Sequence, residues 1–205
     1  MSEVRRKDYE QSDREEMLAF LDQRTHGFLA FVRPDGSPGL VALNYVRVDE
    51  AIYFHGATEG EKMRSLEREP RVTFMVADAF SLVPSYFRDP ERACPATQYY
   101  KAVVVHGEAR IVDDLEERAL ALGALMEKLQ PEGGYRPLRA KDPLYRKAVA
   151  TTGVVAVPIA EMTAKFKFGQ NLPRRKRAQV AEQLTGRGIG RDAETVEMMV
   201  LVKPL

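Results

Sequence analysis

Three β-type segments follow one another with almost no chain between them, and this spacing constrains the fold more than any other feature. They cover about residues 27–33, 39–47 and 51–55. The first two flank RPDGSPG, where Asp-Gly and two prolines predict a hairpin turn, and VDEA predicts a second tight turn. A parallel pair would need a crossover of a dozen or more residues. These strands must therefore pair antiparallel.

The remaining elements extend this pattern without alternating helix and strand. Helices lie at the start, in the middle and at the end, which excludes a doubly wound sheet. The pattern therefore predicts a mainly β fold, a six- to seven-stranded antiparallel barrel with flanking helices. Further strands are expected at about 71–79 and 99–112 and as a last pair within 152–168. Helices are expected at about 13–24, 59–69, 115–129 and 173–185. The segment 79–98 should be irregular, and 130–150 turn-rich with a short helical piece around PLYRKAVA.

Local signals mark three details of these elements. Ser12 stands three residues before Glu15, the spacing of a capping box. Asp113 or Asp114 is the expected cap of the helix that follows. Gly107, inside the long strand, indicates a bulge or a close backbone approach.

Composition limits the classes of protein to which the chain can belong. The 205 residues can bury a real core and predict one domain, residues 1–205, with a helical extension at about 173–205. Lys plus Arg number 31 against 30 Asp plus Glu, so the net charge gives no electrostatic case for nucleic acid. The lone Cys94 excludes an internal disulfide framework. The charged N-terminus is no signal peptide, and no run reaches the ~18 apolar residues of a membrane span, so we expect a cytoplasmic protein.

The turn in AIYFHGATEGEK has two explanations. A helix expected to start near Glu59 would direct free backbone N–H groups at the turn, with Thr58 as cap and Glu61 at capping-box spacing. Lys62 in the first turn opposes the helix dipole unless an anion such as phosphate binds there. The alternative is an ordinary capped surface helix whose lysine faces water, which is the commoner arrangement.

Other polar residues give weaker signals. His55 could bind a ligand, serve as an acid or base, or be a hydrogen-bonded bystander. No two histidines have helical ligand spacing, so we expect no metal site. The cluster Arg174, Arg175, Lys176 and Arg177 could touch nucleic acid or phosphate, but a solvated helix N-terminus explains it better.

Several stretches together resemble one known family. They are GFLAFV with DGSPGLVALNYV, the strand-turn-helix IYFHGATEGEKM before PRVTF, the strand VVVHGEARIV, and KFKFGQN before a helix. In them the chain resembles the flavin-binding split-barrel superfamily, and within it the pyridoxamine 5'-phosphate oxidase-like group that includes the nitroimidazole-resistance reductases. The resemblance covers about residues 12–130 and, through KFKFGQN, reaches about residue 186.

This resemblance implies a homodimer with two FMN sites at the subunit interface. Lys62, Thr58 and nearby backbone amides would hold the phosphate, and Asn44 would offer a donor and an acceptor to the pyrimidine edge of the ring. The implied cofactor-binding residues are Val41, Ala42, Leu43, Asn44, His55, Gly56, Ala57, Thr58 and Lys62, with Gln170 and Asn171 as second-tier candidates.

The sequence also departs from the family pattern. Ala42 stands where the family often has proline, and Ala102 stands where it often has a small hydroxylated residue. The pyridoxamine phosphate oxidases themselves carry an arginine-lysine pair at the phosphate turn, whereas here Glu61 precedes Lys62. Because one cation is lost and a carboxylate gained, we expect weaker electrostatic attraction for phosphate. The longer segments at 79–98 and 130–150 are expected to cover the substrate side.

Three functions compete. The leading one is an FMN-dependent oxidoreductase that takes a hydride from NAD(P)H and reduces a nitro compound or quinone, with His55 and Tyr45 as candidates for a substrate role. The second keeps the fold but binds deazaflavin or haem, and Arg174, Arg175 and Arg177 would suit a long anionic tail. The third is a flavin-sensing regulator whose helix at 173–185 contacts DNA, which the near-zero net charge disfavours.

Overall fold

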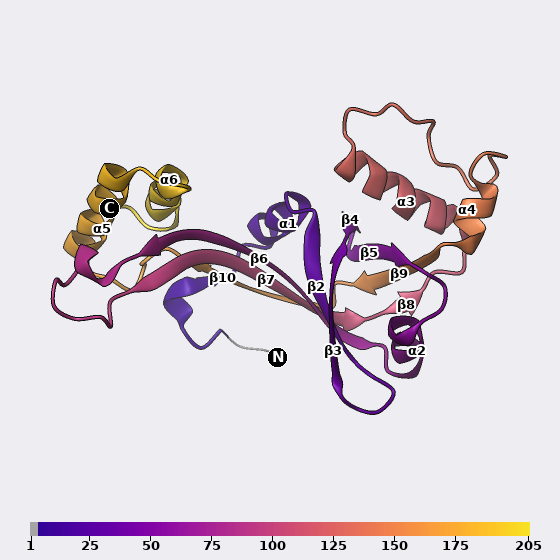
Figure 1. Cartoon of the computed structure of the whole chain (residues 1–205), viewed down its shortest axis with the longest axis horizontal. Helices are drawn as coiled ribbons and strands as arrows, with labels where there is room; N and C mark the ends of the chain where they lie inside the picture. Colours follow the sequence, from indigo (N-terminus) through magenta and orange to yellow (C-terminus); the bar gives the residue numbers. More distant parts are fainter. Residues whose placement is uncertain (1–3) are drawn as a thin grey trace. The chain divides into compact units, whose positions relative to one another are not determined.

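The computed structural model describes residues 4–205, which form two antiparallel sheets with helices beside them (Figure 1). The strand order is β1-β10-β7-β6-β2-β3 in one sheet and β4-β5-β9-β8 in the other. The pairs β1–β10, β2–β3, β2–β6, β4–β5, β5–β9 and β8–β9 are all antiparallel. Because neither sheet closes on itself, the fold is a split barrel, and the predicted fold class is confirmed. Across residues 4–205, no helix combines the length and apolar composition of a membrane span.

Seven strands in the described chain have six residues or more, in line with the predicted six to seven. The strands are β1 (Glu10–Gln11), β2 (His26–Val32), β3 (Pro38–Asn44), β4 (Val46–Val48), β5 (Ala51–Gly56), β6 (Arg71–Val83), β7 (Thr97–Glu108), β8 (Arg110–Ile111), β9 (Gly153–Pro158) and β10 (Glu161–Lys167). The helices are η1 (Lys7–Tyr9), α1 (Arg14–Asp22), α2 (Glu61–Arg68), η2 (Ser85–Phe87), α3 (Leu115–Leu129), α4 (Arg146–Thr151), α5 (Arg174–Arg187) and α6 (Asp192–Val202).

The chain divides into two compact units, each built from separate stretches of sequence. Within the described residues, unit 1 contains 4–17, 77–103 and 163–205, and unit 2 contains 18–76 and 104–162. The two C-terminal helices, α5 and α6, belong to unit 1. The expectation that residues 1–205 form a single domain stays a prediction.

The core of unit 2 forms where the strands bury alternate residues. In β2 the side chains of Leu29 and Phe31 are buried, whereas their neighbours are half-buried or exposed. Tyr45 interrupts the strand predicted over 39–47, so that β3 ends before it and β4 begins after it. Its hydroxyl donates to the Leu21 carbonyl at 2.5 Å, and its ring meets Phe74 edge-on at 4.8 Å. Tyr45 is therefore a core residue with no exposed surface.

The structure confirms the predicted cap of α3 but not the predicted cap of α1. The Asp114 carboxylate accepts from the Glu117 amide at 2.7 Å, which confirms the cap predicted for α3. At α1, the carboxylate of Asp13 accepts from the amides of Glu15 and Glu16 at 2.9 and 3.2 Å. The cap predicted at Ser12 is thus wrong, because the adjacent aspartate takes the amides that Ser12 was expected to bind.

The segment predicted as irregular at 79–98 is partly regular. Strand β6 continues to Val83, and Phe80 packs edge-on against Phe168 at 4.9 Å. The burial of Phe80, Ser81 and Val83 explains why the strand continues although the sequence shows no clean alternation there. In the stretch predicted as turn-rich at 130–150, residues 130–145 lack helix and strand, and the short helical piece is α4, which begins at Arg146.

Two charged side chains are buried in the C-terminal part of unit 1. Arg177, on α5, is fully buried and donates to the carbonyls of Pro204, at 3.0 Å, and of Met199. Asp192, at the start of α6, is 1% exposed and accepts two hydrogen bonds from the Arg187 guanidinium, at 2.8 and 2.6 Å. The solvated surface predicted for the basic cluster is therefore wrong for Arg177.

Gly107 lies in β7 where two backbones meet. A Cβ built on it would lie 2.2 Å from the Pro158 carbonyl oxygen, which confirms the predicted close approach. We expect Gly107→Ala to lower the free energy of unfolding by about 1–3 kcal/mol, because the backbone must shift to admit the methyl group. Urea denaturation measures this. Gly186→Ala is the matched control, since a Cβ there meets nothing within 4 Å and α5 gains a better helix former. Equal loss in both variants would contradict the prediction.

Candidate functional site

The turn between β5 and α2, in unit 2, differs from the expected capped helix. The helix begins at Glu61, and Gly60 occupies the N-cap position with φ 129° and no side-chain cap. The first helical amide bond runs from Arg64 to the Gly60 carbonyl at 3.1 Å. The predicted cap at Thr58 is wrong, because the helix starts two residues later than expected. As a result, the amides of the first helical turn have no capping side chain.

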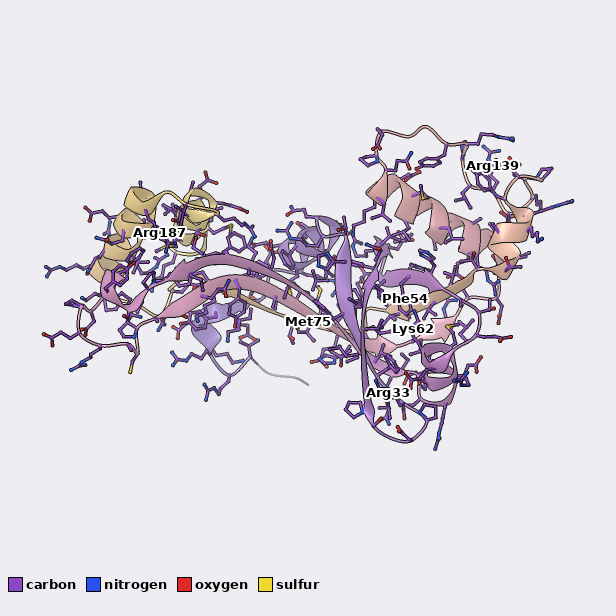
Figure 2. All side chains as sticks on the ribbon, in the orientation of Figure 1. Arg33, Phe54, Lys62, Met75, Arg139 and Arg187 are labelled. Carbon is purple, nitrogen blue, oxygen red and sulfur yellow. The ribbon has the colours of Figure 1, made fainter. Side chains whose placement is uncertain are left out.

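Lys62 lies in that first turn and is half-buried. Its Nζ is 4.9 Å from the centroid of the Phe54 ring, and both residues are labelled in Figure 2. Burial lowers the pKa of the Lys62 ammonium. Within residues 4–205 no carboxylate or hydrogen-bond acceptor pairs with it. A Cβ on Gly56 would lie 3.3 Å from Nζ, so the glycine leaves room beside the ammonium. An unpaired, partly desolvated cation here favours an anionic ligand.

Glu61 was expected to weaken phosphate binding at this turn, but its carboxylate is paired with a cation. The Glu61 carboxylate forms an ion pair with Arg33 at 3.2 Å. Arg33 follows β2 at the base of the hairpin turn, so a second cation stands near the turn (Figure 2). Sequence reasoning missed both Arg33 and Phe54. No spacing signal links either residue to Lys62, because the hairpin and β5 bring them together only in the fold.

Strand β3 presents its residues alternately to two faces. Ala42 and Asn44 are exposed, whereas Val41 and Leu43 are half-buried on the opposite face. The four side chains therefore cannot all face one ligand. Because β3 ends the sheet order, one row of its backbone amides and carbonyls has no neighbouring strand within the described sheet. The backbone of this edge is thus available to a flat ligand.

The polar candidates of unit 2 remain accessible. The Asn44 side-chain amide donates to the Thr25 carbonyl at 3.0 Å, which leaves its oxygen and a second N–H for a ligand. His55, Ala57 and Thr58 are exposed at the end of β5 and in the turn. Tyr45, by contrast, is fully buried with its hydroxyl engaged, so its expected substrate role is corrected to a structural one.

Gln170 and Asn171 belong to unit 1, whereas the other candidates belong to unit 2. The Gln170 side chain accepts from the Phe168 amide at 2.7 Å and donates to the Phe166 carbonyl at 2.5 Å. The Asn171 oxygen accepts from the Tyr9 hydroxyl at 2.6 Å. Gln170 therefore shapes the loop after β10, and Asn171 keeps its amide donors.

An exposed apolar face lies on strands β2, β3 and β6 of unit 2. Cross-strand register aligns Ala42, Phe28 and Met75 in one row. Leu40 and Met75 on this face are 68% and 37% exposed. Beside it a recess of about 640 Å³ is lined by Ala30, Val32, Thr73 and His106, among others. Within residues 4–205, no group of three or more His, Cys, Asp or Glu side chains could hold a metal ion.

Comparison with known proteins places these features in context. The family model described as pyridoxamine 5'-phosphate oxidase matches residues 13–166. Among solved structures, the flavocytochrome Anf3 from Azotobacter vinelandii has a TM-score of 0.69 at 21% identity, covering 86% of this chain and 77% of that one. The FAD and heme binding protein from Mycobacterium smegmatis has a TM-score of 0.66 at 20% identity, covering 83% and 78%.

A third solved structure is a putative 5-nitroimidazole antibiotic resistance protein from Bacteroides thetaiotaomicron. Its TM-score is 0.61 at 22% identity, covering 76% of this chain and 85% of that one. The comparison with curated proteins found no match. At these identities the structural likenesses show the fold alone.

Proposed function

The chain belongs to the pyridoxamine 5'-phosphate oxidase family, whose model matches residues 13–166, and we propose on that premise that it is an FMN-dependent oxidoreductase. The electron donor would be NAD(P)H, and the acceptor a small nitro compound or quinone. The family, together with the flavin-binding proteins of the same fold, supports a flavin-binding oxidoreductase. The nitroimidazole resistance protein of similar fold supports a nitro compound as acceptor.

The single observation that carries the choice of FMN is the environment of Lys62. Its ammonium is half-buried over Phe54 and has no anionic partner in residues 4–205, beside a helix start with no capping side chain. A phosphate monoester fits this donor set, since it would accept from the ammonium and from the first-turn amides. The pairing of Glu61 with Arg33 at 3.2 Å reduces the repulsion that the carboxylate would otherwise exert on that phosphate.

The chain's own residues would bind, orient and shield the cofactor. Lys62 and the turn amides would anchor the phosphate, and the exposed edge of β3 with Asn44 would offer hydrogen bonds to the ring. His55, exposed at the end of β5, is the remaining candidate for contact with substrate. When bound, FMN would supply the hydride and electron transfer, so no protein acid or base is required.

A homodimer is part of the proposal. The apolar face with Leu40, Ala42 and Met75 is exposed in a single chain and would be covered by a second copy. Ala42 and Asn44, two of the candidate ring contacts, lie on this same side of β3, so a cofactor bound there would be enclosed by the partner. Sedimentation analysis should give twice the 23.1 kDa mass of the chain.

A second candidate function keeps the fold and changes the cofactor. Anf3 is a flavocytochrome, and the similar mycobacterial protein binds FAD and haem, so FAD or haem in place of FMN is the strongest alternative. A native haem absorption band or an FAD product after denaturation would favour it. Deazaflavin and a flavin-sensing regulator remain weaker proposals.

The test begins with protein purified without added cofactor. We expect the chromophore released on denaturation to be FMN. We also expect the fluorescence of added FMN to be quenched on binding, with saturation at about one FMN per subunit. The loaded protein should then oxidise NADH or NADPH in the presence of a nitroimidazole or a quinone. Absence of any FMN response would remove the flavoenzyme proposal while leaving the fold unaffected.

A further inference from the structure

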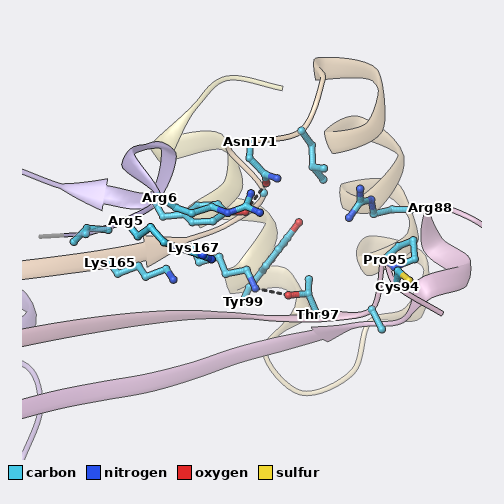
Figure 3. Close-up of a pocket in the computed structure, with 15 residues that line it drawn as sticks. Arg5, Arg6, Arg88, Cys94, Pro95, Thr97, Tyr99, Lys165, Lys167 and Asn171 are labelled. Atoms are coloured by element: carbon cyan, nitrogen blue, oxygen red, sulfur yellow. Dashed lines mark hydrogen bonds between the residues drawn. The ribbon is translucent and has the colours of Figure 1, made fainter. Parts of the chain in front are cut away.

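Unit 1 contains a cavity of about 390 Å³ whose described lining residues all belong to that unit, and Asn171 is the one candidate cofactor residue among them. It lies between the start of the described chain, the loop before β7, and β10 with its following loop (Figure 3). Arg5, Arg6, Arg88, Lys165 and Lys167 contribute its charged lining.

The charge in this cavity is of one sign. Among the described residues, no carboxylate lines it. Within residues 4–205, none of the five cations forms an ion pair with an acidic side chain. Five like charges without counter-charges repel one another, and a bound anion would relieve that repulsion.

Tyr99 adds a buried donor without a partner. The residue is 1% exposed, and its hydroxyl has no hydrogen-bond partner in the described structure. A Cβ on Gly169, where φ is 77°, would lie 2.4 Å from that hydroxyl, so only glycine fits against this end of the ring. Figure 3 shows the hydroxyl end directed toward the space between Asn171 and Arg88. Burial raises the pKa of Tyr99 to about 12, so the group is a neutral donor at physiological pH.

Neighbouring contacts hold the donors in position. Lys165 lies over the rings of Tyr9 and Tyr100, at 5.5 and 5.6 Å, and Lys167 donates to the Thr97 hydroxyl. Burial, followed by the charges of Lys165 and Arg6, lowers the pKa of Lys167. The ammonium groups are thus fixed by aromatic and hydroxyl contacts, which leave their charges available.

We propose that this cavity binds a small molecule that carries a diphosphate group. Guanidinium and ammonium groups with a tyrosine hydroxyl provide donors alone, which suits an oxygen-rich polyanion. The volume of about 390 Å³ is that of a small-ligand site and can admit two phosphates with a modest organic group. The proposal does not rest on FMN binding, since Lys62 and its turn belong to unit 2.

Cys94 provides a reporter within the cavity. It is the single cysteine of the chain, it is exposed, and it is part of the lining. We would follow its alkylation by N-ethylmaleimide, a neutral reagent, while titrating inorganic pyrophosphate, and measure binding directly by calorimetry. The expected result is saturable protection with one site per chain. ADP should protect as pyrophosphate does, whereas adenosine should not.

Single substitutions test whether pyrophosphate binds in this cavity. Lys167→Gln should weaken pyrophosphate binding about tenfold or more, because a charge-assisted contact is lost. Lys141→Gln, which removes the same charge from a side chain 94% exposed in unit 2, should leave binding unchanged. Tyr99→Phe, which keeps the ring packing, should weaken binding severalfold with an unchanged urea midpoint. Lys62→Ala should bind pyrophosphate normally, which separates this site from the proposed FMN site.

Three outcomes would overturn the proposal. Pyrophosphate could leave both the alkylation rate and the calorimetric signal unchanged. Lys167→Gln and Lys141→Gln could weaken binding equally, which would indicate a general charge effect. Adenosine could protect Cys94 as well as ADP does, which would show that phosphate is not what the cavity recognises.

Discussion

Replacing Lys62 with alanine is expected to weaken FMN binding by about tenfold to about one-hundredfold. A hydrogen bond between charged partners contributes about 1.5–3 kcal/mol, and this ammonium is partly desolvated over Phe54, where water competes less for the phosphate. The measurement is a fluorescence titration of FMN with the purified variant. Because Lys62 makes no ion pair within residues 4–205, its removal leaves no acidic partner unpaired.

Two controls make this result specific. Arg64→Ala removes an exposed cation from the same helix and should change FMN affinity little. Riboflavin lacks the phosphate, so its weaker affinity should be the same in the wild type and in Lys62→Ala. Equal loss of FMN affinity in both alanine variants, or loss of riboflavin affinity with Lys62, would contradict the phosphate role.

Asp192→Ala is expected to lower the free energy of unfolding by about 3–5 kcal/mol, because it breaks a buried ion pair and leaves its partner uncompensated. The carboxylate is 1% exposed and accepts from the Arg187 guanidinium at 2.8 and 2.6 Å and from the Ser81 hydroxyl at 2.6 Å. Urea denaturation at pH 7 measures the loss. Asp113→Ala, at an exposed position before α3, is the control and should cost little.

The Asp192 carboxylate should also make the stability of the protein depend on pH in the acidic range. The Arg187 hydrogen bonds, opposed by burial and aided by Ser81, lower the pKa of Asp192 from 3.8 to about 2. A carboxyl group with a lowered folded pKa stabilises the protein above its unfolded pKa, and this contribution disappears as the pH falls through the folded value. The wild-type advantage over Asp192→Ala should therefore shrink by about 2 kcal/mol between pH 4 and pH 2. A pH-independent difference would show that Asp192 acts through packing alone.

The features that sequence could predict are those governed by neighbouring residues. Short loops required antiparallel pairing of β2 with β3 and of β4 with β5, and Asp114 capped the helix that follows it. The capping at Thr58 failed because a glycine with positive φ can occupy the N-cap instead, and composition alone does not choose between them.

Features that depend on distant residues could not be predicted. Alternation over 39–47 did not reveal that Tyr45 would turn into the core, where its hydroxyl reaches a carbonyl of α1. The ion pair of Arg33 with Glu61 joins a hairpin to a helix, and no local pattern records it. The cavity of unit 1 gathers cations from residue 5 to residue 167, so its charge is invisible to any window along the chain.

The burial of Arg177 has a consequence for how the basic stretch RRKR should be probed. Arg177 donates to the carbonyls of Met199 and Pro204, and Lys176 donates to the Arg88 carbonyl at 3.1 Å. A variant with all four residues changed to alanine would lose these buried contacts and unfold the C-terminal helices, so that a gel shift could not separate loss of a nucleic-acid contact from loss of the fold. The informative substitution is charge reversal at Arg175 alone, which is exposed.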